Sequence, residues 1–322
     1  MNKKALEFSF SWIFATIIGA AIISLAVYAA IQIAKTNTGA EETKLSKELT
    51  VLFEPLETKT ASGLASAVKL TQEVRIKSSC EIGGENEFGK QKFQLMAKAG
   101  ITKKWSGQGG NASINHKYIF LNKTADGKKF YFFTKPFNMP FKVANLVYLT
   151  SDKYCFVIPA GSQFEFVRKE MGDFQSELDN IKVVTSQAEC ENGMIKACFG
   201  VSGSCNIAVT GDRDKGIVKK NGKDMNYVTE SFMYGAIFSD YDTYTCNVER
   251  LMKRLRAETT MYVREAQLLS GRCGSIPISS LINFGNNIPK NFESGNAAAG
   301  ALMVSLAASL EDQNQAVECG LW

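Results

Sequence analysis

Residues 8–34 read FSFSWIFATIIGAAIISLAVYAAIQIA, and this stretch decides how the rest of the chain is interpreted. It begins at Phe8, ends at Ala34 and holds no formally charged side chain. As a helix that rises about 1.5 Å per residue, it would extend roughly 40 Å and could cross a hydrocarbon core of about 30 Å with some tilt. The stretch therefore predicts a transmembrane helix that tethers the chain to a lipid bilayer.

The flanking charges predict the orientation of this helix. Lys3 and Lys4 precede it, whereas Lys35 follows it and is soon balanced by Glu41 and Glu42. Because positive residues favour the cytoplasmic side, residues 1–7 are expected in the cytoplasm and the bulk of the chain outside the cell. The predicted localisation is the cell membrane, with a single pass and an extracellular body.

A cleaved signal peptide is the alternative interpretation. Such a leader has an apolar core of about 7–15 residues followed by small residues at the cleavage site. Val27 and Ala29 could mimic that site, but the apolar run is about twice as long as such a core. The length favours a retained anchor, and both interpretations export the rest of the chain.

The cysteines predict a disulfide-bonded body. All eight follow the apolar stretch, and an even number on the exported side is typical of disulfides. A metal site is disfavoured because the chain has one histidine and no Cys-x-x-Cys pair. Spacing alone does not fix the connectivity. The pairs we expect are Cys246 with Cys319, Cys80 with Cys155, and Cys198 with Cys205.

The remaining patterns predict an α+β fold. A helical stalk at residues 35–55 leads into an antiparallel β-rich ectodomain at residues 73–322, as one unit or as subdomains 73–160 and 161–322. The first part should form five or six strands with a hairpin turn at Asp126-Gly127. The second part should begin with a helix at residues 162–180 and continue as antiparallel strands, with a turn at Asn221-Gly222 and a strand at residues 225–238.

Two helices are expected to pack on the ectodomain, a long one at residues 241–269 and a C-terminal one at residues 297–317. If they are antiparallel, they bring Cys319 to the end that carries Cys246. The long helix carries apolar residues on one face and mostly basic residues on the other. We interpret the basic face as a solvated surface with ion pairs, and the alternative is a contact for acidic lipid or an acidic polymer. That face contains Arg250, Lys253, Arg254, Arg256, Glu258 and Arg264.

No catalytic motif is present, so we expect no enzyme, cofactor or metal. His116 should lie in an exposed turn or at a strand edge. The acidic pairs Asp240 with Asp242 and Glu189 with Glu191 could serve a glycosidase or bind calcium, but no other ligands accompany them. Residues 1–35 hold +2 of the net charge of +5, and the remaining +3 indicates no nucleic-acid partner.

Aromatic residues gather between residues 118 and 156, mostly as strand packing predicts. An exposed subset, near a projecting loop within residues 135–150, could stack on sugars or form a surface for a partner protein. Asn111 and Asn122 begin N-x-S/T sequons and are candidate glycosylation sites.

The opening NKKALEFSFSWIFATIIGAAIISLAVYAA, together with KPFNMPFKVANLVYLT and YCF, resembles uncharacterised single-pass archaeal cell-surface proteins. The N-terminus also resembles an archaeal type IV pilin leader, in which two basic residues and a small residue, here Lys3, Lys4 and Ala5, precede the processing site. This second resemblance implies cleavage between Ala5 and Leu6 and packing of the apolar helix into a filament.

Three functions therefore remain open. We favour a membrane-anchored extracytoplasmic protein with a non-enzymatic ectodomain that binds or scaffolds a surface protein or glycan. The alternatives are a type IV pilin-like filament subunit and a membrane-tethered exported hydrolase. A deep pocket with convergent carboxylates would favour the hydrolase.

Overall fold

The computed structural model describes residues 23–26, 28, 64–84, 87–99, 104–105, 111–201, 203–272, 276–289 and 297–322. Within the predicted transmembrane stretch it shows helix at residues 23–26 and 28, where Ile23, Leu25 and Tyr28 are exposed. The rest of that stretch, the predicted stalk and the predicted processing site lie outside the described residues. Among the helices that are described, none is both long and apolar enough to cross a membrane.

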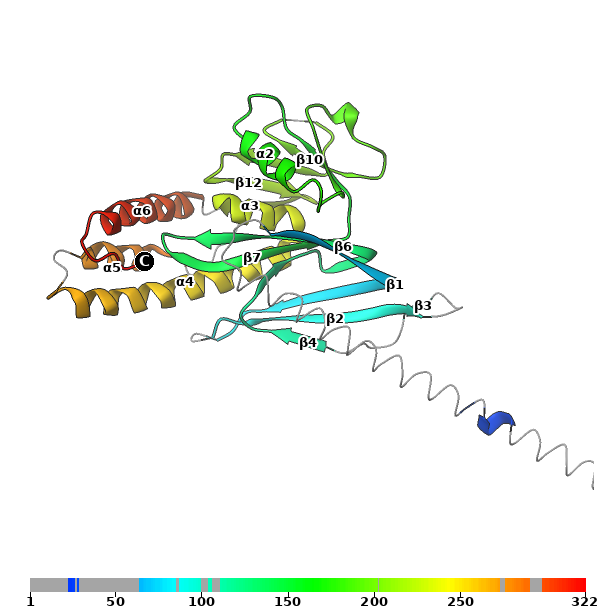
Figure 1. Cartoon of the computed structure of the whole chain (residues 1–322), viewed down its shortest axis with the longest axis horizontal. Helices are drawn as coiled ribbons and strands as arrows, with labels where there is room; N and C mark the ends of the chain where they lie inside the picture. Colours follow the sequence, from blue (N-terminus) through cyan, green and yellow to red (C-terminus); the bar gives the residue numbers. More distant parts are fainter. Residues whose placement is uncertain are drawn as a thin grey trace, which may run out of the picture.

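The first sheet holds seven strands among the described residues, in the order β3-β2-β1-β6-β7-β5, with β4 beside β2 (Figure 1). All neighbours are antiparallel except β5 and β7, which are parallel. The strands are β1 (Ala65–Glu81), β2 (Lys90–Ala99), β3 (Lys104–Trp105), β4 (Asn111–Ile114), β5 (Tyr118–Phe120), β6 (Thr124–Asn138) and β7 (Lys142–Thr150).

The hairpin predicted at Asp126-Gly127 is wrong, because both residues lie inside β6. Asp126 pairs across the strands with Arg75, which also forms an ion pair with it at 2.8 Å (Nε–Oδ1). Gly127 lies so close to Ser151 that an added Cβ would come within 2.9 Å of the Ser151 Cβ. The glycine permits a close approach between chain segments here and does not form a turn.

The first sheet curls around its own small core, and the fully buried side chain of Gln91 closes the curl. Its amide donates to the Ile119 carbonyl and accepts from the Ile119 N–H, both at 2.8 Å, which joins β2 to β5. The curl encloses the side chains of Val74, Ile76, Phe93, Leu95, Ile114, Ile119, Leu121, Ala125, Phe130, Phe132, Val147 and Leu149.

The second sheet has the order β13-β12-β11-β10-β8-β9. In this sheet β9, β8, β10 and β11 lie side by side and pair as parallel neighbours. The pairs β11–β12 and β12–β13 are antiparallel. Our expectation of a fully antiparallel sheet was wrong, since short apolar strands show the same pattern in both arrangements. The strands are β8 (Tyr154–Val157), β9 (Ile181–Val184), β10 (Ile195–Phe199), β11 (Ile207–Gly211), β12 (Lys215–Lys220) and β13 (Lys223–Val228).

Short connections join these strands. The predicted helix at residues 162–180 is observed as the shorter α2 (Glu165–Asp173), between β8 and β9, and the 3-10 turn η1 (Gln187–Glu189) follows β9. The predicted turn between β12 and β13 is confirmed. Asn221 and Gly222 have φ values of 52° and 73°, as a two-residue hairpin turn requires.

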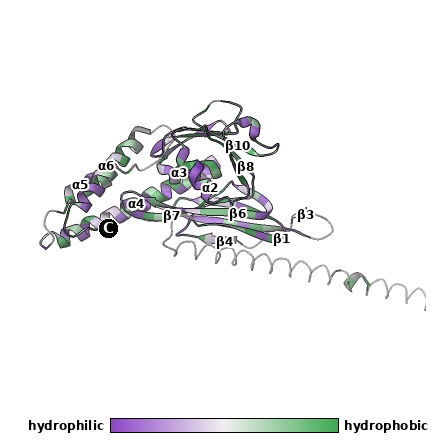
Figure 2. Cartoon of the chain, turned by 45° about the horizontal axis from the view of Figure 1, so that its top comes forward, coloured by the Kyte–Doolittle hydropathy of each residue, from purple (hydrophilic) through white to green (hydrophobic). Residues whose placement is uncertain are grey.

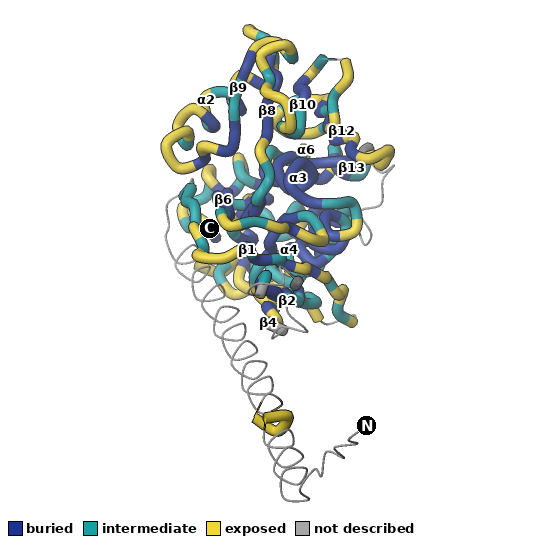
Figure 3. The backbone as a smooth tube through the Cα atoms, turned by 90° about the vertical axis from the view of Figure 1, so that its right-hand side faces the viewer, coloured by how far each residue is buried: buried dark blue, intermediate teal, exposed yellow. Residues whose placement is uncertain are grey.

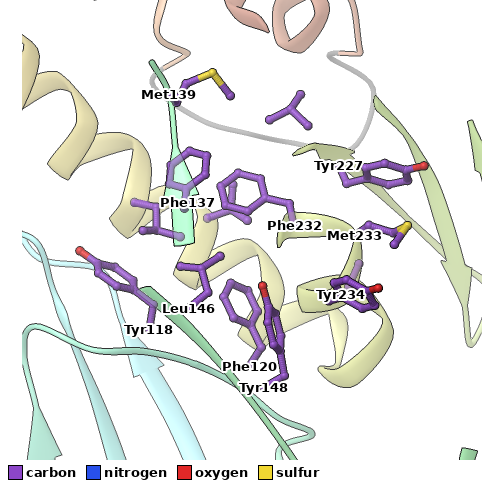
Figure 4. Packing of buried hydrophobic residues seen from close by; sticks show 14 of the residues in the cluster. Tyr118, Phe120, Phe137, Met139, Leu146, Tyr148, Tyr227, Phe232, Met233 and Tyr234 are labelled. Carbon is purple, nitrogen blue, oxygen red and sulfur yellow. The ribbon is translucent and has the colours of Figure 1, made fainter. Parts of the chain in front are cut away.

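Helix α3 (Thr229–Phe238) lies between the two sheets. The sequence of this segment was predicted to form a strand, and that prediction was wrong. Its residues from Ser231 to Phe238 are all buried (Figure 3), so it lacks the polar face that makes a helix recognisable in a sequence. Gly235 allows the ring of Phe120 to pack against the helix, because an added Cβ would lie 2.8 Å from two ring carbons. Both sheets and α3 contribute to one hydrophobic core (Figure 4).

The predicted long helix is confirmed as α4 (Tyr241–Leu269), and Asp240 caps it by accepting from the Thr243 N–H at 2.9 Å. Hydrophilic and hydrophobic residues alternate along it, as one buried face requires (Figure 2). It is followed by α5 (Ile278–Asn287) and by α6 (Ala297–Gln315), which was predicted to end two residues later.

The disulfides confirm the predicted class of bond and one of the three predicted pairs, Cys198 with Cys205. The pairing of Cys80 with Cys155 was wrong: Cys80 bonds Cys246, and Cys155 bonds Cys190. The pairing of Cys246 with Cys319 was also wrong, because Cys246 bonds Cys80. Cys319 is also disulfide-bonded. The error arose because β8, which carries Cys155, belongs to the second sheet.

Candidate functional site

A hollow of about 540 Å³ lies between β6, α2 and α3. We call it the Lys135 hollow, after the lysine of β6 that contributes to its lining. It is lined by Lys135, Pro136, Phe166, Lys169, Glu170, Asp173, Phe174, Arg213 and Glu230.

Lys135 is nearly buried, with 8% of its side chain exposed, and its ammonium group contacts two carboxylates. Its Nζ lies 2.6 Å from Glu170 Oε1 and 2.8 Å from Glu230 Oε1. Glu170 comes from α2 and Glu230 from the first turn of α3, so one lysine of the first sheet ties both helices together. A buried ammonium of this kind needs such partners, because leaving water is costly for a charge.

The outer oxygens of both glutamates are also hydrogen-bonded. Tyr234 donates its hydroxyl to Glu170 Oε2 at 2.7 Å, and Arg213 donates Nε to Glu230 Oε2 at 2.8 Å. Burial tends to raise the pKa of Glu230, but the hydrogen bonds from Arg213 and Lys135 outweigh it and keep that pKa below its ordinary value. Burial raises the pKa of Tyr234 well above its ordinary value, so its hydroxyl stays a donor.

Thr229 holds the turn that delivers Glu230 to this hollow. Its φ of 73° is unusual for a β-branched residue and marks the sharp change from β13 into α3. Its N–H donates to the Asp214 carbonyl at 2.7 Å, next to Arg213. Its hydroxyl is buried and has no hydrogen-bond partner among the described residues. Such strain is often found beside functional groups, and here it positions the Glu230–Arg213 pair.

Glu170 and Glu230 form a carboxylate pair that one ammonium group bridges. A glycosidase needs one carboxylic acid with a raised pKa beside one carboxylate. Here Lys135 bridges both glutamates, and the pKa of Glu230 is lowered. Glu230 therefore stays a carboxylate and does not match the carboxylic acid of such a pair. Across the described residues, no group of three or more His, Cys, Asp and Glu side chains could hold a metal.

The site residues considered in the sequence lie elsewhere. His116 is exposed in a bend, as predicted, and lines a second hollow of about 460 Å³ that we call the His116 hollow. Asp240 caps α4 while Asp242 is exposed. Glu189 forms a capping box with Ser186 at η1, and Glu191 pairs with Lys182 at 3.0 Å. Neither acidic pair converges on a ligand site.

The basic face of α4 was expected to be solvated, and this was correct only in part. Arg254 and Glu258 pair at 2.8 Å as predicted. Arg250, in contrast, is fully buried and binds backbone carbonyls in loops between strands of the first sheet. Lys253 likewise binds the carbonyls of Gly83 and Gly84, and Arg256 binds those of Ile288 and Pro289.

The aromatic residues between 118 and 156 are core residues, as strand packing predicts. The rings of Phe120, Phe133 and Tyr148 are at most 2% exposed and pack on one another. The segment expected as a projecting loop, residues 135–150, is instead the β6–β7 hairpin with its turn at Met139-Pro140. Its aromatic side chains are buried and therefore offer no stacking platform of the kind proposed from the sequence.

Asn122 is half-buried and belongs to a polar cluster around Lys220. The Lys220 ammonium donates to Asn122 Oδ1 at 3.1 Å and to the carbonyls of Ile237 and Ser239 at 2.9 and 2.8 Å. Glycosylation at Asn122 stays a prediction, and a glycan there would have to leave this contact in place. The side chain of Asn111 lies outside the described residues.

Lys220 gives a testable pH dependence. Burial lowers its pKa to about 8, against smaller opposing effects of Asp240 and Asp152. The ordinary lysine pKa of 10.5 applies in the unfolded chain, so between these values the unfolded state holds more protons and the folded state gains stability as pH rises. We therefore compare the free energy of unfolding of the wild type with that of Lys220→Met by urea unfolding. As pH rises from below the folded-state pKa of about 8 to pH 9.5, the wild type should gain about 2 kcal/mol relative to this variant.

The control for this experiment is Lys219→Met, which removes an exposed lysine next to Lys220. Its stability should follow the wild type across the same pH range. Equal pH slopes for Lys220→Met and the wild type would show that Lys220 is not the titrating group.

The residues of the Lys135 hollow are far apart in the sequence, and no motif connects them. One signal was available: Lys135 interrupts the aromatic run of β6, which reads FYFFTKPF, at a position that the strand buries. A lysine in such a run needs an acidic partner, although the sequence does not say which one.

Comparisons with protein-family models, with curated proteins and with solved structures found no match. The site must therefore be interpreted from its own geometry.

Proposed function

We propose that this chain is a membrane-anchored extracytoplasmic protein whose body binds another molecule and does not catalyse a reaction. The observation that carries the proposal is the disulfide framework. Among the described residues no cysteine is free, and one bond joins positions 166 residues apart. Bonds of this kind persist in oxidising compartments outside the cytosol.

The anchor is argued from the sequence. Residues 8–34 are apolar and long enough to span a bilayer, and Lys3 and Lys4 favour a cytoplasmic N-terminus. All eight cysteines follow this stretch, so an anchor in this orientation would put each of them on the oxidising side. The resemblance to single-pass archaeal cell-surface proteins supports the same arrangement.

Binding is favoured over hydrolysis by the Lys135 hollow. It has convergent carboxylates, which the hydrolase alternative required, but both share the ammonium of Lys135. A preformed hollow with fixed charges and apolar walls is suited to recognise a ligand.

Protease accessibility tests the topology. In spheroplasts of an expressing bacterium, added protease should degrade the body and spare a tag placed before residue 8. Cysteines should resist alkylation until a reductant is added, and the protein should stay in membranes after carbonate washing. A protected body, or thiols that are alkylated without reductant, would contradict the proposal.

The N-terminus decides between a single anchored protein and a filament subunit. The pilin-like leader, Lys3-Lys4-Ala5, is the observation that favours the second function. Mass spectrometry of the membrane-extracted protein should find a start at Met1 or Asn2 for the anchored protein. A start at Leu6 would instead support leader processing.

A further inference from the structure

The Lys135 hollow combines apolar walls with fixed hydrogen-bonding groups. Phe166 and Phe174 are half-buried and line it together with Pro136. The Arg213 guanidinium lies 5.4 Å from the centre of the Phe166 ring, so cation and ring form one continuous wall. Aromatic and proline rings offer flat C–H and π surfaces that a ligand can stack on.

The polar groups leave bonding capacity for a ligand. Each oxygen of Glu170 and Glu230 accepts one hydrogen bond from the described residues and can accept another. Arg213 uses Nε for Glu230, and 61% of its side chain is exposed, so its terminal nitrogens can donate to a ligand. The hollow therefore offers both acceptors and donors to a ligand.

The charges of the hollow balance. Three lining residues are basic and three are acidic, and Lys135 is already neutralised by the two glutamates. An anion would be repelled by the carboxylates, and a cation would be repelled by Lys169 and Arg213. A neutral molecule that both donates and accepts hydrogen bonds meets neither penalty.

We propose that the Lys135 hollow binds a neutral oligosaccharide. A sugar ring has an apolar face of C–H groups that fits the phenylalanine and proline walls, and hydroxyls that can donate to the glutamates and accept from Arg213. A volume of about 540 Å³ is within the usual range for small-ligand sites. This inference rests on the proposed function, because it names the ligand class of the same site.

The test is isothermal titration calorimetry on the full chain in a detergent without sugar groups. The probes are maltotriose, cellotriose, N,N′,N″-triacetylchitotriose and mannotriose, with glucuronic acid as an anionic and glycine betaine as a zwitterionic comparison. At least one neutral trisaccharide should bind. Phe166→Ala should weaken it roughly fivefold to tenfold through the lost stacking surface. Arg213→Ala should weaken it by a similar factor through the lost charged donor.

Phe88→Ala is the matched control, because Phe88 is half-buried and lines the His116 hollow instead. It should bind the trisaccharide as the wild type does. The proposal is overturned if no neutral trisaccharide binds, if both hollow variants bind like the wild type, or if only glucuronic acid or glycine betaine binds.

The outcomes separate the two proposals. A body outside the membrane that binds no sugar refutes the ligand class and leaves the topology standing. Sugar binding by a body on the cytosolic side refutes the topology and leaves the ligand class standing.

Discussion

Replacing Arg250 with alanine is expected to destabilise the folded protein by roughly 4–6 kcal/mol, or to prevent folding altogether. The guanidinium is fully buried and lies 4.7 Å from the centre of the Tyr118 ring. Removing it would leave partly buried carbonyls without donors, at up to about 1–3 kcal/mol each. It donates to the carbonyls of Phe88, Gly89, Asn115 and Lys117 and to Asn247 Oδ1.

Urea unfolding of the oxidised protein measures this effect. Arg264→Ala is the control, because Arg264 is exposed on the same helix and should change stability by no more than about 0.5 kcal/mol. Arg250→Lys should fall between the two, since lysine keeps the charge but not the planar fork of donors. A loss below about 1 kcal/mol for Arg250→Ala would show that water replaces the missing donors.

Local signals explain why part of the fold could be predicted. The ends of α4 were predicted correctly because Asp240 can cap the helix and apolar residues recur along one face. The turn at Asn221-Gly222 was also predicted correctly, because few other residue pairs accept positive φ at both positions. Each of these features is decided within a few residues of the chain.

The errors concern features that depend on distant partners. Helix α3 is buried on all sides, so its sequence has no periodic polar face, and it was predicted as a strand. The parallel pairing of β8 with β10 brings together segments about forty residues apart. Because β8 belongs to the second sheet, Cys155 reaches Cys190 and leaves Cys80 for α4.

The Lys135 hollow was missed for the same reason. Its central groups come from a strand of the first sheet, from two helices and from the turn between β11 and β12. Only the folded chain brings Lys135, Glu170, Arg213 and Glu230 together. The positive φ of Thr229, directly before Glu230, could not be predicted from the residue type, because threonine disfavours positive φ.

Replacing both Cys80 and Cys246 with serine is expected to cost about 5 kcal/mol, the largest effect of the three described disulfides. This bond joins β1 to α4 across 166 residues, the longest separation among the described disulfides, so breaking it frees the longest of their loops in the unfolded chain. It lies one turn from Arg250 on α4, and both hold that helix against the first sheet. The double variant should therefore unfold at a much lower urea concentration than the wild type.

The matched control is the double variant Cys198→Ser with Cys205→Ser, whose cysteines are separated by only 7 residues. The loop-entropy argument predicts a loss of about 2–3 kcal/mol for this pair. Equal losses for the two double variants would mean that local packing around each bond, and not loop length, sets its contribution. A smaller loss for Cys80 and Cys246 than for the control would show that Arg250 and its carbonyl contacts hold α4 in place without the covalent bond.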